Sequence, residues 1–156
     1  MEIVVRDLTE QDIDQIYKPG VLNQDFQVGE TGFYDQKYLT AWLKQKNDDI
    51  LLVANKDGQI VGFLFCRVMF RTWAMGENIM VLPKDKDVGV DEALFAECQK
   101  RLGKLGIDDI DWLARPDSNE EKFLAKMSFK KGNQFYWWEK MTRPVWPDHQ
   151  EIKKAS

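Results

Sequence analysis

The part of this chain with the clearest chemical meaning is a strand-like segment that passes through a loop into a helix. Residues 79–82 are apolar, Pro83 follows, and a charged loop with a single glycine, Gly89, leads into a helical pattern. Unpaired backbone N–H groups and the positive end of a helix dipole meet at such a junction, and together they suit a phosphate group. The segment therefore predicts an anion-binding loop, with an ordinary strand-to-helix turn as the alternative.

The same segment resembles the cofactor-binding motif of the GCN5-related N-acetyltransferase (GNAT) superfamily. In that motif a strand ending in apolar-x-Val-x-Pro runs into Arg/Gln-x-x-Gly-x-Gly/Ala and a helix, and the matching residues here are Lys86, Gly89 and Asp91. Lys86 keeps a cation and Gly89 keeps the glycine, whereas Asp91 places a carboxylate where the family has no side chain, so the motif is divergent. The resemblance implies that acetyl-CoA binds here as a cosubstrate. The implied contacts along the pantetheine arm and around the pyrophosphate are Ile79, Met80, Val81, Lys86, Asp87, Val88, Gly89, Val90, Asp91 and Glu92.

Glu77 and Asn119 also stand where the family carries functional residues. Many members have a glutamate near the acetyl group at the position of Glu77, and burial beside apolar side chains would raise its pKa toward neutrality, which suits a general base. The alternative is a solvent-facing strand residue. Asn119 resembles the asparagine that contacts the cofactor arm, with plain helix capping as its alternative.

The tyrosine with which the family often protonates the leaving thiolate is absent, because residues 123–126 read Phe-Leu-Ala-Lys. Bulk water or another tyrosine would then supply the proton. A covalent mechanism through Cys66 or Cys98 is disfavoured because the single histidine, His149, lies in the C-terminal tail. Amine acetylation requires no metal, and the sequence predicts no metal site.

The acceptor amine is expected to bind at the two N-terminal helices and their connecting loop. Glu30, Tyr34 and Tyr38 give this region an acidic and aromatic character that suits a cationic amine. The alternative is that Tyr38 and Trp42, at helical spacing, belong to the core.

Composition limits the class of protein. The chain has 156 residues, a net charge of -4 and a pI near 5.1, which argues against nucleic acid as a main partner. No apolar run reaches the roughly 20 residues needed to cross a bilayer, so we expect a cytoplasmic protein with no membrane partner. One domain is expected over residues 1–143, with an irregular tail over 144–156. Cys66 and Cys98 lack metal-ligand spacing and are expected in the core without a disulfide.

Hydrophobic periodicity predicts the order strand-helix-helix-strand-strand-strand-helix-strand-helix-strand. Local signals include a cap at Asp35, an Asp57-Gly58 hairpin turn and a capping box at Ser118. The first helix is expected to stop at Pro19-Gly20, and the helix burying Leu94, Cys98, Leu102 and Leu105 to end at Gly103 and Gly106. Aromatic residues 134–141 are expected to close the sheet, either buried on both faces or at an edge used by a homodimer. This order matches the GNAT-like α/β (α+β) fold, a mixed central sheet flanked by helices.

The function expected from this resemblance is direct transfer of an acetyl group from acetyl-CoA to a primary amine of a small molecule or peptide. A catalytically inactive protein of the same fold, acting in protein interaction or as a CoA sensor, is the alternative. Measuring whether acetyl-CoA raises the melting temperature would distinguish a protein that binds the cosubstrate from one that does not. A ligand at a hundred times its dissociation constant adds roughly 2.7 kcal/mol to the free energy of unfolding.

Overall fold

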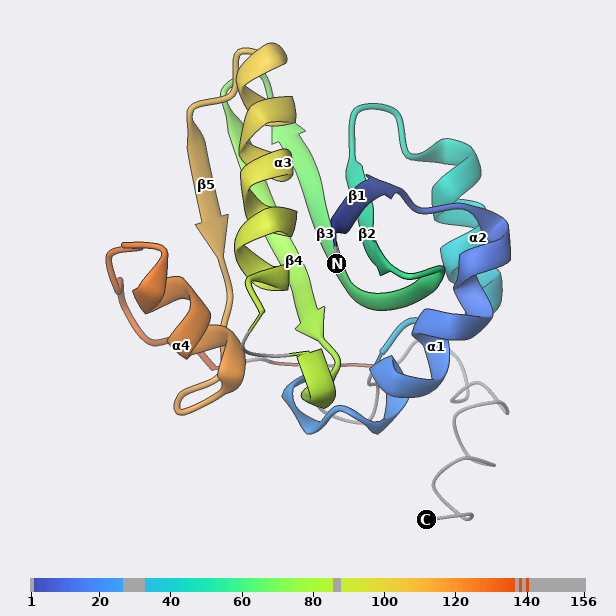
Figure 1. Cartoon of the computed structure of the whole chain (residues 1–156). Helices are drawn as coiled ribbons and strands as arrows, with labels where there is room; N and C mark the ends of the chain where they lie inside the picture. Colours follow the sequence, from blue (N-terminus) through green and yellow to red (C-terminus); the bar gives the residue numbers. More distant parts are fainter. Residues whose placement is uncertain (1, 27–32, 86–87, 137, 139, 141–156) are drawn as a thin grey trace.

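The computed structural model describes residues 2–26, 33–85, 88–136, 138 and 140, which form a five-stranded sheet with helices on both faces (Figure 1). The main elements in chain order are β1 (Ile3–Asp7), α1 (Ile13–Leu22), α2 (Gln36–Gln45), β2 (Ile50–Lys56), β3 (Gln59–Phe70), β4 (Trp73–Val81), α3 (Val90–Lys104), β5 (Asp109–Trp112) and α4 (Asn119–Lys126). Three short 3-10 turns are η1 (Glu10–Asp12), η2 (Gln24–Phe26) and η3 (Pro83–Asp85). Strands β1 to β4 pair antiparallel in chain order, and β5 pairs parallel to β4. The expected mixed sheet flanked by helices is confirmed.

The sheet separates two hydrophobic cores. Helix α3 covers one face, and α1 and α2 lie on the other (Figure 1). The core under α3 includes Leu64, Leu94 and Cys98, and the core under α1 and α2 includes Phe63 and Phe65. Side chains of β3 thus alternate between the two cores, as the period of a strand buried on both faces requires. Both cysteines are buried and free, as expected.

Capping and turn residues close to each boundary determine where most helices and strands begin or end. The Asp35 carboxylate accepts from the Tyr38 N–H at 2.6 Å and starts α2, and the Ser118 hydroxyl accepts from the Glu121 N–H at 3.0 Å and starts α4. Asp57 and Gly58 both have positive φ, at 54° and 81°, as the tight turn between β2 and β3 requires. The caps at Asp35 and Ser118 and the hairpin turn are confirmed. The capping box is incomplete, because the Glu121 carboxylate accepts from the Asp117 N–H at 2.6 Å and the Ser118 N–H donates to Arg115.

Two helix-end predictions are wrong. Helix α1 continues through Pro19 and Gly20 to Leu22, because Gly20 packs directly under the Phe33 ring, where a Cβ would clash. Gly20 therefore allows α1 to pack against Phe33, and the stabilisation from this contact exceeds the cost of the backbone hydrogen bond lost at Pro19. Gly103 lies inside α3, while Gly106, at φ 75°, follows the helix end in the left-handed conformation expected of a C-terminal glycine. Leu105 is exposed and does not join the buried face of α3.

The closing strand predicted over residues 134–141 is not observed in the described residues of that segment. Phe135, Tyr136 and Trp138 are 77%, 82% and 90% exposed and belong to no strand. Aromatic strand propensity expresses packing on a half-buried sheet surface, and these side chains have no such surface. The tail expected from residue 144 lies outside the described residues.

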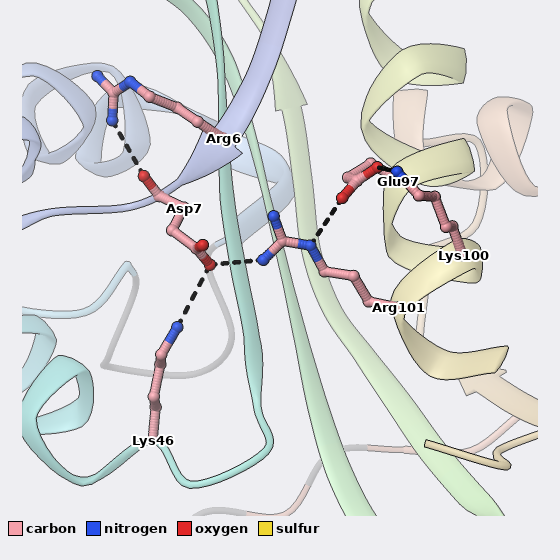
Figure 2. Close-up of polar contacts among 6 residues, drawn as sticks. All are labelled: Arg6, Asp7, Lys46, Glu97, Lys100 and Arg101. Atoms are coloured by element: carbon pink, nitrogen blue, oxygen red, sulfur yellow. Dashed lines mark hydrogen bonds and ion pairs between the residues drawn. The ribbon is translucent and has the colours of Figure 1, made fainter. Parts of the chain in front are cut away.

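Charged side chains at the end of β1 connect the two helical layers. Figure 2 shows the Asp7 carboxylate between Lys46, at the end of α2, and Arg101 on α3, at 3.4 and 2.6 Å. Arg101 also pairs with Glu97 at 2.9 Å. Because Asp7 is half exposed, this network adds little to the free energy of unfolding. No helix in the described part of the chain has both the length and the apolar character of a membrane span.

Candidate functional site

Strand β4 changes character at Glu77. On one side of the strand, Phe65 pairs with Asn78 and Cys66 pairs with Gly76, so Glu77 is the extra residue of a β-bulge. On the other side, pairing with β5 ends at Gly76 opposite Trp112. A bulge bends a strand and redirects its side chains, and bulges are common beside active sites. In the described residues, the half of β4 after Gly76 thus has a strand partner on one edge and an open edge on the other.

The bulge places the Glu77 carboxylate among polar and aromatic groups of α2 and β3. The Tyr34 hydroxyl donates to Glu77 Oε2, and Arg67 Nε donates to Oε1. Arg67 Nη2 donates to the Tyr38 hydroxyl at 2.8 Å, and the guanidinium lies 3.9 Å above the Trp42 ring. The structure therefore brings together Glu77, Tyr34 and Tyr38, which sequence reasoning had named for separate roles.

Asn78 adds a further contact to this cluster, since its side-chain amide donates to the Tyr34 hydroxyl at 3.2 Å. The Tyr34 and Tyr38 rings stack with their centroids 5.2 Å apart, and Trp42 is buried against them while Tyr38 stays partly exposed. Trp42 thus belongs to the core, and Tyr38 lies at the boundary between core and surface.

Burial raises the pKa of Glu77 to about 7. The Arg67 guanidinium opposes this shift, because a cation and its N–H donor favour the charged carboxylate. A carboxylate with these opposing influences can accept a proton near neutral pH and hold it away from bulk water.

The open edge of β4 presents backbone donors. The Leu82 N–H donates to Val61 on β3 at 2.9 Å, so the alternating N–H groups of Ile79 and Val81 point to the other edge. On that edge the backbone of Ile79 lowers the pKa of Glu120, whose carboxyl group comes from the first turn of α4. Met80 packs on the α1 side of the sheet, while Ile79 is buried under α3.

Glu120 is a residue that sequence reasoning missed. Its side chain is buried, with 6% of the residue exposed, and Trp112 Nε1 donates to Glu120 Oε1 at 2.7 Å. Burial raises the pKa of Glu120 to about 8, and the charge of Asp25 adds to that effect. The sequence does show a glutamate directly after Asn119 and a tryptophan at the end of the preceding strand. Neither residue type by itself indicates that Trp112 and Glu120 are in contact.

Asn119 makes its contacts away from the β4 edge. Its backbone N–H and its side-chain amide donate to Asp25 Oδ2 at 3.3 and 3.2 Å. Asp25 belongs to η2, so these bonds connect the start of α4 to the segment after α1. The helix cap itself is Ser118, and the capping alternative for Asn119 is therefore wrong.

The loop before α3 keeps the conformation expected of an anion-binding turn. Gly89 has φ 78° and immediately precedes the helix, and a Cβ there would meet no atom nearer than 3.8 Å. Val88 is half exposed, whereas the Val90 side chain is fully buried, so only the backbone of Val90 can face a ligand. Lys86, Asp87 and Glu30 lie outside the described residues.

Asp91 and Glu92 form a carboxyl pair in the first turn of α3, and Lys126 of α4 ion-pairs with both, at 3.5 Å from Asp91. Burial and the neighbouring Glu92 raise the pKa of Asp91, while hydrogen bonds from Asp91 and Lys126 lower that of Glu92. Lys126 thus offsets part of the negative charge of the carboxyl pair. Among the described side chains, no group of three or more His, Cys, Asp or Glu is placed to hold a metal ion.

Comparison with known proteins rests on structure. Neither a family model nor a curated protein sequence matches the chain. A transcriptional regulator from Bacillus halodurans superposes with a TM-score of 0.72 at 18% identity, covering 88% of this chain and 99% of that one. AAC(6')-Iy, solved with a CoA-containing bisubstrate analogue, gives 0.71 at 16% identity over 90% and 99% of the two chains.

A third match is the PaiA N-acetyltransferase from Thermoplasma acidophilum, solved with coenzyme A. It gives a TM-score of 0.66 at 20% identity, over 86% of this chain and 94% of that one. Identities of this size show shared architecture and leave substrate open. The chain has the fold of the GCN5-related N-acetyltransferases.

Proposed function

We propose that this protein is an N-acetyltransferase that moves an acetyl group from acetyl-CoA directly to a primary amine of a small molecule or peptide. The observation that carries the proposal is the position of Glu77, a half-buried carboxyl group with a pKa of about 7 at the point where the open edge of β4 begins. A general base there accepts the proton that the amine loses as it attacks the thioester.

Two features of the described residues fit acetyl-CoA. The outward N–H group of Val81 can pair with an amide group of the pantetheine arm in the manner of an added strand. The Gly89 turn, followed by the N-terminus of α3, presents backbone donors to a pyrophosphate. Lys126 moderates the repulsion expected from Asp91 and Glu92.

The acceptor side of the proposed site combines Glu77 with the aromatic rings of Tyr34, Tyr38 and Trp42. The ring faces and the carboxylate can bind a protonated amine, and the carboxylate can accept a proton from the amine as it reacts. Arg67 holds Glu77 in place from β3 and balances its charge while no substrate is bound. Relatives of known structure include enzymes named for aminoglycosides and for a ribosomal protein, so small-molecule and peptide amines both stay within the proposal.

The experiment that tests this function measures acetyl-CoA binding by calorimetry and turnover with a panel of primary amines. Glu77→Gln should lower kcat at neutral pH by roughly 10²–10⁴-fold with little change in acetyl-CoA affinity, because the base acts in the chemical step. The wild-type rate should rise with pH through about 7, and this limb should be lost in the variant. Glu97→Gln, which alters an ion pair on the outer face of α3, is the matched control.

Wild-type protein that binds no acetyl-CoA would overturn the proposal. Binding without turnover on any amine would instead favour a CoA-sensing or protein-interaction role. The observation favouring that second candidate is the exposed aromatic group of Phe135, Tyr136 and Trp138, which suits a protein surface, including that of a second copy. Deleting the residues from 134 onward would then abolish association and leave acetyl-CoA binding unchanged.

A further inference from the structure

The buried carboxyl group of Glu120 has no part in the mechanism described so far. It comes from α4, yet the groups that act on it belong to the sheet. Trp112 Nε1 on β5 donates to Glu120 Oε1 at 2.7 Å, and the backbone of Ile79 on β4 lowers the pKa of Glu120. Trp112 is fixed in turn, because its ring packs on Gly76, where a Cβ would clash, and against Phe95 and Phe123. The carboxyl group is therefore held at the start of the open edge of β4 by a rigid support.

Glu77 and Glu120 are both linked to the same part of β4. Glu77 is the bulged residue itself, and Glu120 is bonded to Trp112, whose ring packs on Gly76, the residue before the bulge. Asp25 on η2 faces Glu120 as well, and its negative charge, together with burial, favours the neutral carboxylic acid. A neutral acid held in a fixed position on α4, together with a base at the bulge of β4, is an arrangement that can both remove and return a proton.

We propose that Glu120 is the proton donor to the thiolate that leaves when the acetyl group is transferred. This inference rests on the proposed acetyltransferase function. It also accounts for the absence of a tyrosine among residues 123–126, since the acid would come from the residue after Asn119.

The proposed step balances as follows. The amine nitrogen forms a bond to the thioester carbonyl carbon and passes its proton to Glu77, and the C–S bond then breaks. The sulfur takes the proton of the Glu120 carboxyl group and leaves as a thiol. The Glu120 carboxylate that is formed keeps the Trp112 N–H, a donor that favours the charged form. Solvent exchange returns the proton from Glu77 to Glu120, so that the sum is acetyl thioester plus amine giving amide plus thiol.

The central test is Glu120→Gln, which keeps one oxygen for the Trp112 N–H but has no acidic proton. We expect kcat at pH 7 to fall by roughly 10²-fold or more, with acetyl-CoA affinity changed less than threefold. The wild-type rate should fall as pH rises through about 8, and that limb should be absent in the variant. Glu121→Gln, one residue on and facing Lys131, is the matched control and should retain both rate and profile.

Two further measurements separate proton donation from a structural role. An acetyl donor with a more acidic leaving thiol should bring the rates of wild type and Glu120→Gln close together, because such a thiolate needs no acid. Trp112→Phe removes one donor to the charged carboxyl group, so the alkaline limb should move to higher pH.

Carbon-13 NMR of the glutamate carboxyl groups in the free protein gives a readout that is independent of activity. A signal lost in Glu120→Gln should titrate near pH 8 in the wild type. Titration of that signal near its ordinary value, or an unchanged alkaline limb in an active Glu120→Gln, would overturn the role of Glu120 alone. Wild-type protein that binds acetyl-CoA but acetylates no amine, or that binds none, would overturn the proposed function and this step with it.

Discussion

The two halves of β4 satisfy their backbone in different ways. From Trp73 to Gly76 the strand has β3 on one edge and β5 on the other, with the Trp112 ring closed over Gly76. From Glu77 to Val81 the described residues give it a strand partner on the β3 edge, and on the other edge the backbone of Ile79 lowers the pKa of the Glu120 carboxyl group. The half from Trp73 to Gly76 therefore depends on close packing of side chains, and the half from Glu77 to Val81 depends on ionisable groups.

This difference explains why the perturbed carboxyl groups gather where they do. An open strand edge inside the protein leaves N–H donors that need acceptors, and a carboxyl group from a neighbouring helix can supply one. Burial then raises the pKa of that carboxyl group toward neutrality, where the group can take part in proton transfer. The paired half should thus respond to changes in side-chain volume, and the open half to changes in charge and pH.

The largest effect is expected from pH acting on the open half. Folded protein keeps the Glu120 proton up to about pH 8, whereas the unfolded chain loses it near its ordinary pKa of 4.5. Between these values the unfolded state binds fewer protons, so the free energy of unfolding should fall as pH rises from about 4.5 to about 8, by an amount on the order of 4 kcal/mol. Urea denaturation across this range should show a smaller decline in Glu120→Gln, in which the raised pKa of Glu77 still contributes part of the slope. An equal decline in both proteins would contradict the account, and Glu121→Gln should retain the wild-type slope.

The paired half should be broken by volume alone. Gly76→Ala places a methyl group against the Trp112 ring and should cost roughly 1–3 kcal/mol in the free energy of unfolding at every pH. Gly103→Ala is the control, since a Cβ there meets nothing within 4 Å and a helical alanine should add about 0.5–1 kcal/mol. A neutral Gly76→Ala would show that β5 moves freely relative to β4.

Backbone conformation at the turn before α3 should give a smaller change in stability with a separate effect on binding. Gly89→Ala imposes a side chain on a residue with φ 78° and should cost roughly 1 kcal/mol. Acetyl-CoA affinity should also fall, because the proposed pyrophosphate contacts need this backbone. Gly58→Ala, at φ 81° in the β2–β3 turn, should cost as much stability and leave affinity unchanged. Equal affinities in all three proteins would remove the pyrophosphate from this turn.

The smallest effect concerns charge at the first turn of α3. Asp91→Gly should tighten acetyl-CoA binding by less than about fivefold at low salt, because Lys126 already offsets the carboxyl pair and exposed ion pairs contribute little. The gain should shrink at high salt. Lys126→Met is the partner variant and should weaken binding. Weaker binding in Asp91→Gly at low salt would show that the carboxylate does not repel the ligand.

The sequence alone determined the elements and most of their boundaries. The Asp35 and Ser118 caps, the Asp57-Gly58 turn and the strand-helix order depend on residues close together in the chain, so their physical causes can be read locally. Glu77 could also be named, since it lies on the strand leading into the Gly89 turn. What it contacts could not be named from the sequence.

Tertiary structure decided the contents of the candidate site. Arg67 reaches Glu77 because β3 and β4 pair with a bulge at that residue, and Glu120 reaches Ile79 because β5 stops pairing at Trp112. Neither the register of two strands nor the point where they part is set by residue type. The same reason explains why the described residues of the predicted closing strand, among them Phe135, Tyr136 and Trp138, are not in a strand, since their side chains are exposed and pack on no sheet surface.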